Sequence, residues 1–445
     1  MQTLTEIYVP EAALGGSMRD FRVPQGPDIL GRVEAFYSWQ DTRRQSGLWP
    51  FCRSTDSAPT AICVARDDRG ERMHGVNFAS QDYLSLASHP SIKATAKQVI
   101  EQYGVHSAGS PALVGNTVYS VKLERAIADF LQMREVVLFP TGWAAGFGAI
   151  RGLVRSSDYV VIDALAHTCL QEGAAAATRN VALFRHLDVD HCRERLQRIR
   201  AKDTQCGILV VTESLFSMDS DTPDLAAMQE LCHEYNATLM VDVAHDLGCL
   251  GEDGTGHIGM QGMLGKLDIV MGSFSKTFAS NGGFVACKTR AVKEYLNFYS
   301  PPCTFSNALS PVQAAVVLNA FDIVRSGEGR GLRHALMANV LELRRQLETA
   351  GMEVYGAPSA IVAVRMGAES LARLVSRRLP QLGLIANLVE YPAVAKGAAR
   401  FRLQVMANHT AENIAEAVRR LQVAVEDATA DLAYLTEPPL LKATA

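Results

Sequence analysis

The stretch Leu267-Asp268-Ile269-Val270-Met271-Gly272-Ser273-Phe274-Ser275-Lys276 decides how the rest of this chain is interpreted. Its apolar run is typical of a buried strand, and the run leads through two serines to a lysine. A lysine at the exit of a buried strand is unusual because ammonium groups prefer water. Partial desolvation favours the neutral amine, which attacks carbonyl carbons. The stretch therefore allows two interpretations, a Schiff-base lysine and a lysine that extends from the strand end into solvent.

Composition describes a globular protein rather than a membrane or nucleic-acid-binding one. The 445 residues exceed what one small core organises, so two or more domains are expected. The 43 basic against 47 acidic residues offer no electrostatic attraction for nucleic acid. No apolar run is long enough for a membrane span, and the N-terminus lacks the features of an export signal. The nine cysteines form no Cys-x-x-Cys pair, so we expect reduced thiols, no metal site and a cytoplasmic location.

Short apolar runs alternate with helical patterns in the middle of the chain, which predicts a mostly parallel sheet covered on both faces. The expected strands are residues 136–139, 159–162, 181–184, 207–212, 238–243 and 267–272. Beyond Pro311 two long helices precede a smaller α+β domain, whose expected strands are residues 352–355, 360–366, 384–391 and 401–406. The predicted domains are an N-terminal segment (1–76), a large domain (77–325), a small domain (326–432) and a tail (433–445).

Polar side chains follow several of the predicted strands. Asp242 and His245 come directly after one apolar run, and His167 follows another. Asp242 can cap a helix, or it can meet a protonated pyridine nitrogen, because a buried carboxylate needs a cationic partner. His245 can lie on the surface or bind a neighbouring ring oxygen. His167 can stack on a ring or pack in the core.

A phosphate site is expected where Gly142 and Trp143 open a helix after the strand at 136–139, since free N–H groups at a helix start hold phosphate. Ser217, after another strand, can bind a ligand or belong to a turn. Together with Lys276 these residues are what pyridoxal phosphate requires, an amine for its aldehyde, a carboxylate for its ring nitrogen and dipoles for its phosphate. The combination favours the Schiff-base interpretation of Lys276.

These motifs resemble those of the α-oxoamine synthases, which are fold type I pyridoxal phosphate enzymes, over about residues 77–421. The segments that carry the resemblance are residues 77–84, 213–219, 241–245, 272–276 and 305–311. Within the family the chain is most similar to serine palmitoyltransferases, with some likeness to α-hydroxyketone autoinducer synthases. The resemblance implies an α/β large domain with a mostly parallel seven-stranded sheet, a smaller C-terminal α+β domain, and pyridoxal 5'-phosphate as cofactor.

The resemblance also implies roles around the cofactor ring. Lys276 would hold the aldehyde and then take and return the α-proton of the amino acid. Asp242 would pair with the ring nitrogen. His245 and Ser217 would bind the ring hydroxyl, and His167 would stack on the ring.

Further roles follow from the same resemblance for the phosphate and the substrate. The residues expected at the phosphate are Gly142, Trp143, Ser273, Ser306 and Asn307. The last two would reach it from the partner subunit of a homodimer with shared active sites. Asp82 would lie near the substrate, and Arg402 would grip the carboxylate of the amino acid, since a planar bidentate donor suits that task.

The implied reaction is the decarboxylative condensation of a small amino acid, with L-serine as first choice, with a long-chain acyl-CoA or acyl carrier protein thioester. Its products would be CO₂, the free thiol and a 3-ketosphinganine-like α-amino ketone of sphingolipid biosynthesis. The chain departs from the family pattern at Pro111, Ser120, Val243 and Asp246. These departures keep glycine, alanine or an autoinducer-type amino acid with a shorter thioester as candidate substrates.

Two hypotheses from different functional classes stand beside this reaction. An aminotransferase would use the same lysine and aspartate, and a scaffold subunit of a heteromeric synthase would be non-catalytic. We expect no membrane span, and peripheral membrane contact is compatible with a lipid substrate.

Overall fold

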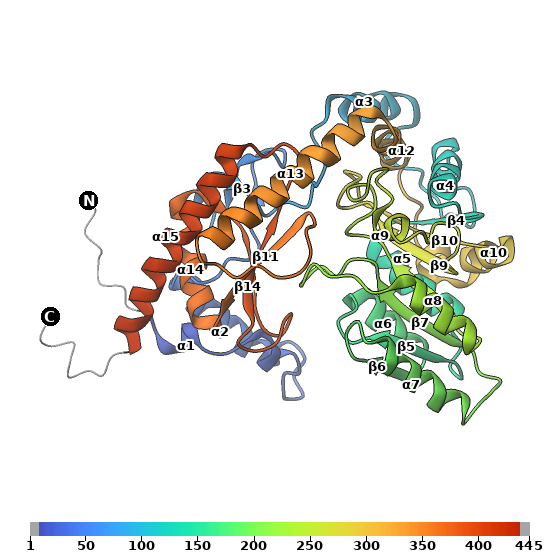
Figure 1. Ribbon diagram of the computed structural model, residues 1–445, viewed down its shortest axis with the longest axis horizontal. Coiled ribbons are helices and arrows are strands. Elements are labelled where there is room, and N and C mark those ends of the chain that lie inside the picture. The colour runs from blue at the N-terminus through green and yellow to red at the C-terminus, as the bar shows by residue number, and fades with distance from the viewer. Residues whose placement is uncertain (1–8, 437–445) are drawn as a thin grey trace, which may run out of the picture. The chain divides into compact units, whose positions relative to one another are not determined.

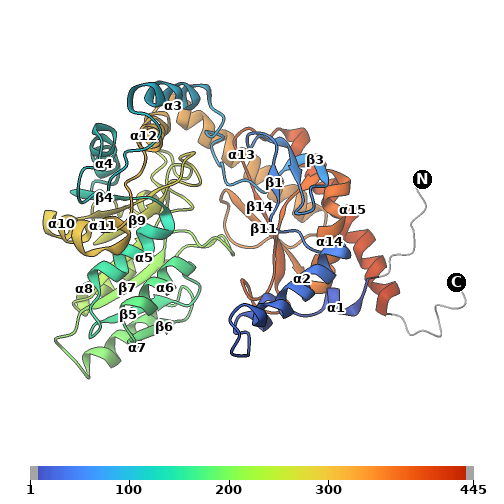
Figure 2. The same ribbon diagram turned by 180° about the vertical axis from the view of Figure 1, so that it is seen from behind.

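The computed structural model describes residues 9–436, which form two compact units (Figures 1 and 2). The first, here the sheet unit, comprises residues 81–337. The second, here the terminal unit, joins the described residues up to Ser80 with those from Ala338 onward. The sequence predicted a separate segment at 1–76, whereas the described part of it, from residue 9, forms one unit with the C-terminal part of the chain. The predicted tail at 433–445 lies mostly outside the described residues.

A seven-stranded sheet forms the core of the sheet unit, as the family resemblance implied. In sheet order its strands are β4 (Glu135–Phe139), β10 (Gly283–Cys287), β9 (Ile269–Ser273), β8 (Thr238–Asp242), β7 (Ile208–Glu213), β5 (Tyr159–Asp163) and β6 (Val181–Phe184). Strand β10 is antiparallel to both neighbours, and the pairs from β9 to β6 are parallel. The central strands β7, β8 and β9 are almost entirely buried, which explains their continuous apolar sequences.

Small residues allow two helices to pack closely on one face of this sheet. Helices α5 (Gly142–Leu153) and α6 (Thr168–Ala177) contribute alanines to one core cluster with side chains from six of the strands. A Cβ on Gly146 would lie 2.7 Å from the Cys169 sulfur, so only glycine permits the observed approach of α5 to α6. The close packing holds the start of each helix near the strand ends.

The remaining helices of the sheet unit follow the predicted alternation. They are α3 (Pro90–Tyr103), α4 (Val118–Leu131), α7 (Val189–Arg200), α8 (Leu225–Glu234), α9 (Gly256–Met260), α10 (Arg290–Tyr299), α11 (Pro301–Thr304) and α12 (Pro311–Arg325). Helix α12 starts with a capping box, in which Ser310 accepts the N–H of Gln313 and Pro311 occupies the first helical position. Helix α13 (Gly327–Thr349) continues from the sheet unit into the terminal unit. None of the helices within residues 9–436 has the length and apolar content to cross a bilayer.

The terminal unit contains two small sheets. One has the order β1 (Ser54–Thr55), β2 (Ile62–Arg66), β3 (Arg72–Asn77) and β12 (Leu384–Ile385), and the other has β11 (Ile361–Gly367), β14 (Ala399–Gln404) and β13 (Asn387–Val389). Its helices are α1 (Glu11–Leu14), η1 (Met18–Phe21), η2 (Gly31–Val33), α2 (Glu34–Gln45), α14 (Glu369–Leu382) and α15 (Ala411–Thr436). The strand predicted at 384–391 is divided between these sheets, because β12 pairs with β3 and β13 with β14. The strand predicted at 352–355 is reduced to a single bridge between Val354 and Val364.

Buried charges tie the N-terminal helices to the C-terminal part of the terminal unit. Glu390 accepts hydrogen bonds from Arg43 of α2 at 2.9 Å and from Arg373 of α14 at 2.6 Å, and all three side chains are buried. Arg373 also donates to the backbone carbonyls of Gly15 and Gly16 at 2.9 and 2.8 Å. A buried charge network of this kind is costly to break one partner at a time.

We predict that Gly75→Ala strongly destabilises the terminal unit. A Cβ at Gly75 would lie 1.8 Å from the carbonyl oxygen of Gly383, where β3 meets the start of β12. The backbone would have to move, so we expect a loss of about 3 kcal/mol in the free energy of unfolding. Gly331→Ala in α13 is the control, because a Cβ there meets nothing within 4 Å and alanine favours the helix. Urea denaturation followed by circular dichroism measures both, and equal midpoints for the two variants would contradict this packing.

Candidate functional site

Four polar side chains stand at the carboxyl ends of neighbouring strands in the sheet unit. Asp163 ends β5, Glu213 ends β7, Asp242 ends β8, and Ser273 ends β9, three residues before Lys276. Ligands of open α/β sheets bind at this edge, because side chains from several strands and the helix starts that follow them meet there. The sheet thus brings together residues that are more than one hundred positions apart in the chain.

Asp242 is the buried anion of this group. Only 6% of the residue is exposed, and Oδ1 accepts the N–H of Ala244 at 2.8 Å. Burial raises the pKa of the Asp242 carboxyl, while Lys276, and after it His167, act in the opposite direction. These electrostatic effects place Lys276 and His167 in the surroundings of Asp242. Three of the four predicted catalytic side chains, Asp242, Lys276 and His167, therefore interact electrostatically.

Glu213 is a second carboxyl group beside Asp242, and the sequence assigned it no role. The two residues are direct partners in the register of β7 and β8. Burial, followed by the charge of Asp242, raises the pKa of Glu213 well above its ordinary value. Its Oε1 accepts the backbone N–H of His167 at 2.5 Å, which holds the start of α6. Glu213 belongs to one of the motifs that carried the family resemblance. The sequence alone could not show that it contacts His167, so it gave Glu213 no role.

His167 is oriented by the first turn of α6. Its Nδ1 accepts the N–H of Cys169 at 3.3 Å and lies 3.0 Å from the Cys169 sulfur. With Nδ1 as an acceptor, the neutral ring carries its proton on Nε2. The hydrogen bond between the His167 N–H and Glu213 fixes the backbone of the same residue. Backbone and ring are thus held independently, as a stacking position requires.

His245 is held by a tyrosine that the sequence did not single out. The hydroxyl of Tyr83 lies 2.9 Å from Nδ1 of His245, and Tyr83 is completely buried. The hydroxyl therefore fixes the orientation of the His245 ring. Tyr83 lies in the motif at residues 77–84, but nothing local in the sequence connects it to a histidine 162 positions later.

The start of α5 forms a cradle against the end of β9. Thr141 caps the helix by accepting the N–H of Ala144 at 3.0 Å. A Cβ on Gly142 would lie 2.3 Å from both Cβ and Oγ of Ser273, so glycine alone allows this approach. The N–H groups of a first helical turn have no partner within the helix, and they attract oxyanions. The cradle therefore combines N–H donors with the hydroxyl of Ser273, which lies 2.7 Å from that of Ser275.

Other predicted residues of the sheet unit lie at less enclosed positions. The indole of Trp143 stacks on Phe147 with ring centroids 5.0 Å apart and is 47% exposed. The hydroxyl of Ser306 donates to the carbonyl of Pro302, and Nδ2 of Asn307 lies 3.1 Å from Nε2 of His106. The contacts of Ser306 and Asn307 with the phosphate of a partner subunit, and the contact of Trp143 with the phosphate, stay predictions.

The two residues predicted to bind substrate have different structural settings. Asp82 is buried, and its carboxylate accepts the N–H groups of Leu86 and Ala87 at 2.9 to 3.2 Å, so it shapes the turn that follows. Burial raises the pKa of Asp82 to about 6. Arg402 lies in the terminal unit, where β14 pairs with β11 and β13, and is partly buried. Contact of either residue with substrate stays a prediction.

His186 links two of the loops that carry predicted ligand-binding residues. Its Nδ1 lies 2.9 Å from Oδ1 of Asp163, which precedes the loop to His167, and its Nε2 lies 3.1 Å from Oδ2 of Asp221. Asp221 bridges back to Phe216, which closes the loop that contains Ser217. Burial opposes protonation of His186, but the two carboxylates outweigh it and raise the pKa to about 10. The sequence missed this link, because His186 follows its strand without any recognisable motif.

The residues of this site fit pyridoxal phosphate. A buried carboxylate with a raised pKa is stabilised by a protonated ring nitrogen. A lysine in its surroundings supplies an amine for an aldehyde, and the cradle at Gly142 and Ser273 suits a phosphate.

Known proteins are similar to this chain over most of its length. The family model for aminotransferase class I and II matches residues 73–421. The chain is 32% identical to 8-amino-7-oxononanoate synthase of Thermoanaerobacter pseudethanolicus over 78% of this chain and 87% of that relative. It is 31% identical to 2-amino-3-ketobutyrate coenzyme A ligase of Escherichia coli over 85% and 93%. The solved structure of Sphingomonas wittichii serine palmitoyltransferase aligns with a TM-score of 0.84 and 25% identity, covering 91% of this chain and 99% of that chain.

The sheet topology, with an aspartate ending β8 and a lysine just after β9, defines fold type I of the pyridoxal phosphate enzymes. The chain belongs to the aminotransferase class I and II family and, within it, to the α-oxoamine synthases. The predicted family, fold type and cofactor, pyridoxal 5'-phosphate, are thereby confirmed.

We predict that the contribution of His186 to stability depends on pH. A histidine whose pKa rises from 6.5 to about 10 on folding stabilises the protein fully below pH 6.5, and this stabilisation is lost as the pH rises to about 10. The free energy of unfolding of wild type should therefore exceed that of His186→Gln most at pH 6 and least above pH 10. Urea denaturation at pH 6, 8 and 10.5 measures the difference. The matched variant His74→Gln, at an exposed position on β3, should show no such trend, and a constant difference for His186→Gln would contradict the link.

Proposed function

We propose that this α-oxoamine synthase condenses L-serine with a long-chain acyl thioester. The products are CO₂, the free thiol and a 3-ketosphinganine-like α-amino ketone. The general reaction, an amino acid joined to an acyl thioester with loss of CO₂, is that of the family. Serine and the long acyl chain are the proposed details.

The observation that carries the proposal is the placement of three residues at the strand ends: Asp242 ends β8, Lys276 follows the neighbouring strand β9, and His167 follows β5. Pyridoxal phosphate, when bound, supplies the electron sink of the reaction. The carboxylate of Asp242 keeps the ring nitrogen protonated and so maintains that sink. The amine of Lys276 would hold the aldehyde of the cofactor, and it would take and return the proton at Cα of the amino acid. His167 would cover one face of the ring and exclude water from it.

The remaining residues position the cofactor. First-turn N–H groups at Gly142 and Trp143 and the hydroxyl of Ser273 bind the phosphate. His245, oriented by Tyr83, and Ser217 bind the ring hydroxyl. These assignments are proposals that rest on the motifs and on the geometry of the cradle.

The choice of serine is supported by structural likeness to serine palmitoyltransferases over nine-tenths of the chain. A second candidate within the family uses alanine or glycine with a shorter thioester, and the similarity to 8-amino-7-oxononanoate synthases and 2-amino-3-ketobutyrate coenzyme A ligases favours it. An aminotransferase would use the same lysine and aspartate but would release no thiol. A scaffold subunit would have no reason to retain Lys276 and Asp242 together.

We also propose a homodimer with shared active sites. Phe305 is 86% exposed, directly before Ser306 and Asn307, and Tyr299 is 63% exposed in the same region. Large exposed apolar side chains of this kind mark an interaction surface. A cytoplasmic location and a place in sphingolipid biosynthesis complete the proposal.

We predict that purified protein with added pyridoxal phosphate shows a visible absorption band and that Lys276→Ala abolishes it, because the band requires the link between cofactor and lysine. Thiol release from acyl-CoA should disappear in the same variant. The band is measured by absorption spectroscopy and thiol release with a thiol reagent. CO₂ is measured from an amino acid with a labelled carboxyl carbon. Wild-type protein without a band would contradict the whole reaction, and a band without thiol release or CO₂ would favour the aminotransferase.

The amino acid is identified by adding serine, glycine and alanine in turn with acyl-CoAs of different lengths. Serine should shift the absorption band and release thiol with long-chain donors. A response to alanine or glycine alone would transfer the proposal to the second candidate.

We predict that Arg402→Gln raises KM for the amino acid by about 10- to 100-fold and leaves the absorption band intact, because a charged hydrogen bond to the carboxylate is lost. Arg402→Lys should lie between wild type and the glutamine variant. Arg365→Gln is the matched control, since Arg365 is on neighbouring β11 and pairs with exposed Glu353. An unchanged KM in Arg402→Gln would remove this residue from the substrate site.

A further inference from the structure

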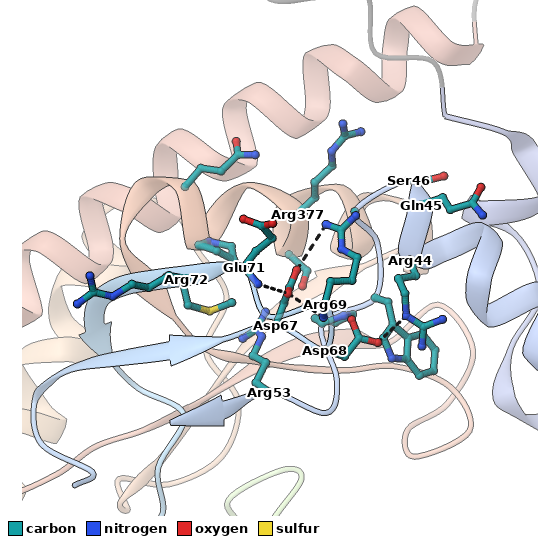
Figure 3. Close-up of a pocket in the computed structure, with 17 residues that line it drawn as sticks. Arg44, Gln45, Ser46, Arg53, Asp67, Asp68, Arg69, Glu71, Arg72 and Arg377 are labelled. Atoms are coloured by element: carbon teal, nitrogen blue, oxygen red, sulfur yellow. Dashed lines mark hydrogen bonds and ion pairs between the residues drawn. The ribbon is translucent and has the colours of Figure 1, made fainter. Parts of the chain in front are cut away.

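A cavity of about 440 Å³ lies within the terminal unit (Figure 3). Its walls come from the end of α2, the segment that follows it, the turn between β2 and β3, and one side of α14. None of the residues assigned to the reaction lines it. We call it the arginine pocket, and its lining residues are Arg44, Gln45, Ser46, Gly47, Trp49, Pro50, Arg53, Asp67, Asp68, Arg69, Glu71, Arg72, Met73, Ser376, Arg377, Pro380 and Gln381.

Positive charge exceeds negative charge in the lining. The lining contains five arginines and three carboxylates. Two of the arginines form ion pairs, Arg44 with Asp68 at 2.6 Å and Arg69 with Asp67 at 3.4 Å. The other three, Arg53, Arg72 and Arg377, form no ion pair within the described part of the chain. The lining therefore carries more guanidinium groups than carboxylates to neutralise them.

Three lining residues also carry buried N–H groups without an acceptor in residues 9–436. They are Nε1 of Trp49, Nε of Arg53 and Nη1 of Arg377. Trp49 is only 8% exposed. Burial lowers the pKa of both Arg53 and Arg377, and Arg378 adds to the effect at Arg377. Unsatisfied buried donors are rare in folded proteins because each costs free energy, so three around one cavity indicate an acceptor supplied from outside.

We propose that the arginine pocket binds a small phosphate-bearing molecule. Guanidinium groups bind phosphate oxygens in pairs, and Arg53 and Arg377 both line the cavity. The apolar surfaces of Trp49, Pro50, Met73 and Pro380 suit the organic part of the molecule. The volume lies in the range of small-molecule sites. The proposal is independent of the proposed reaction.

The test is a calorimetric titration of full-length protein loaded with pyridoxal phosphate, so that the cofactor's own phosphate site is filled. Inorganic diphosphate is the probe. We expect one site per chain, with affinity that falls as salt is added because the attraction is electrostatic. Arg53→Gln and Arg377→Gln should each weaken binding about tenfold, in line with the loss of one charged hydrogen bond. The control Arg365→Gln, in the same unit and outside the pocket, should leave binding unchanged.

Glu71→Gln tests the same site with the opposite sign. Glu71 is an exposed carboxylate in the lining, and removing its charge should tighten diphosphate binding several-fold without affecting the fold. This variant keeps the test decisive if an arginine variant unfolds. Absence of diphosphate binding, or binding that ignores Glu71→Gln and both arginine variants, would overturn the proposal.

The phosphate can belong to a free metabolite or to the nucleotide part of coenzyme A, and a competition experiment separates the two. If coenzyme A displaces diphosphate and Arg377→Gln raises KM for the acyl donor, the ligand is the donor's nucleotide. If diphosphate binds but coenzyme A does not displace it and Arg377→Gln leaves KM for the acyl donor unchanged, the ligand is a separate phosphorylated metabolite. Both results support a phosphate site, and they differ only in its source.

Discussion

A carboxylate buried at the end of a central strand is the constraint on which the site depends. Asp242 is fixed by the register of β8 between β7 and β9 and cannot reach bulk water. An isolated buried anion is unfavourable, so its surroundings must supply positive charge. Lys276, just after β9, does so, and the pyridine nitrogen of the cofactor would complete the compensation. The raised pKa of Glu213 follows from the same constraint, because burial and then the adjacent charge of Asp242 disfavour its ionised form.

Beyond this centre, charges alternate along the strand ends. Asp163 is paired with His186, and His186 with Asp221, so the loops that carry His167 and Ser217 are held by one protonated ring. The ring is kept protonated by two carboxylates despite its burial. Hydrogen bonds from Tyr83 to His245 and from His167 to Glu213 add fixed orientations. The site is thus built from residues whose positions are determined before any ligand arrives.

Sequence and structure agree where the signal is local. The apolar runs predicted the strands. Asp242 and Lys276 were predicted as site residues because each follows an apolar run within a few positions. Contacts between distant residues escaped prediction. Tyr83 with His245, Glu213 with His167 and His186 with two aspartates depend on which strands are neighbours. The prediction of one continuous strand at 384–391 was wrong for the same reason. Its first part pairs with β3, more than three hundred positions earlier in the chain.

The pairing of β3 with β12 and of Arg43 with Glu390 has a consequence for synthesis on the ribosome. Arg43 and Glu390 are 347 positions apart, so the first eighty residues leave the ribosome long before their partners exist. The sheet unit between them is continuous in sequence and can fold while translation proceeds. During that interval the N-terminal segment exposes a strand edge and apolar side chains such as Trp49 and Met73. Chaperone capture of nascent chains should therefore be concentrated on the N-terminal segment.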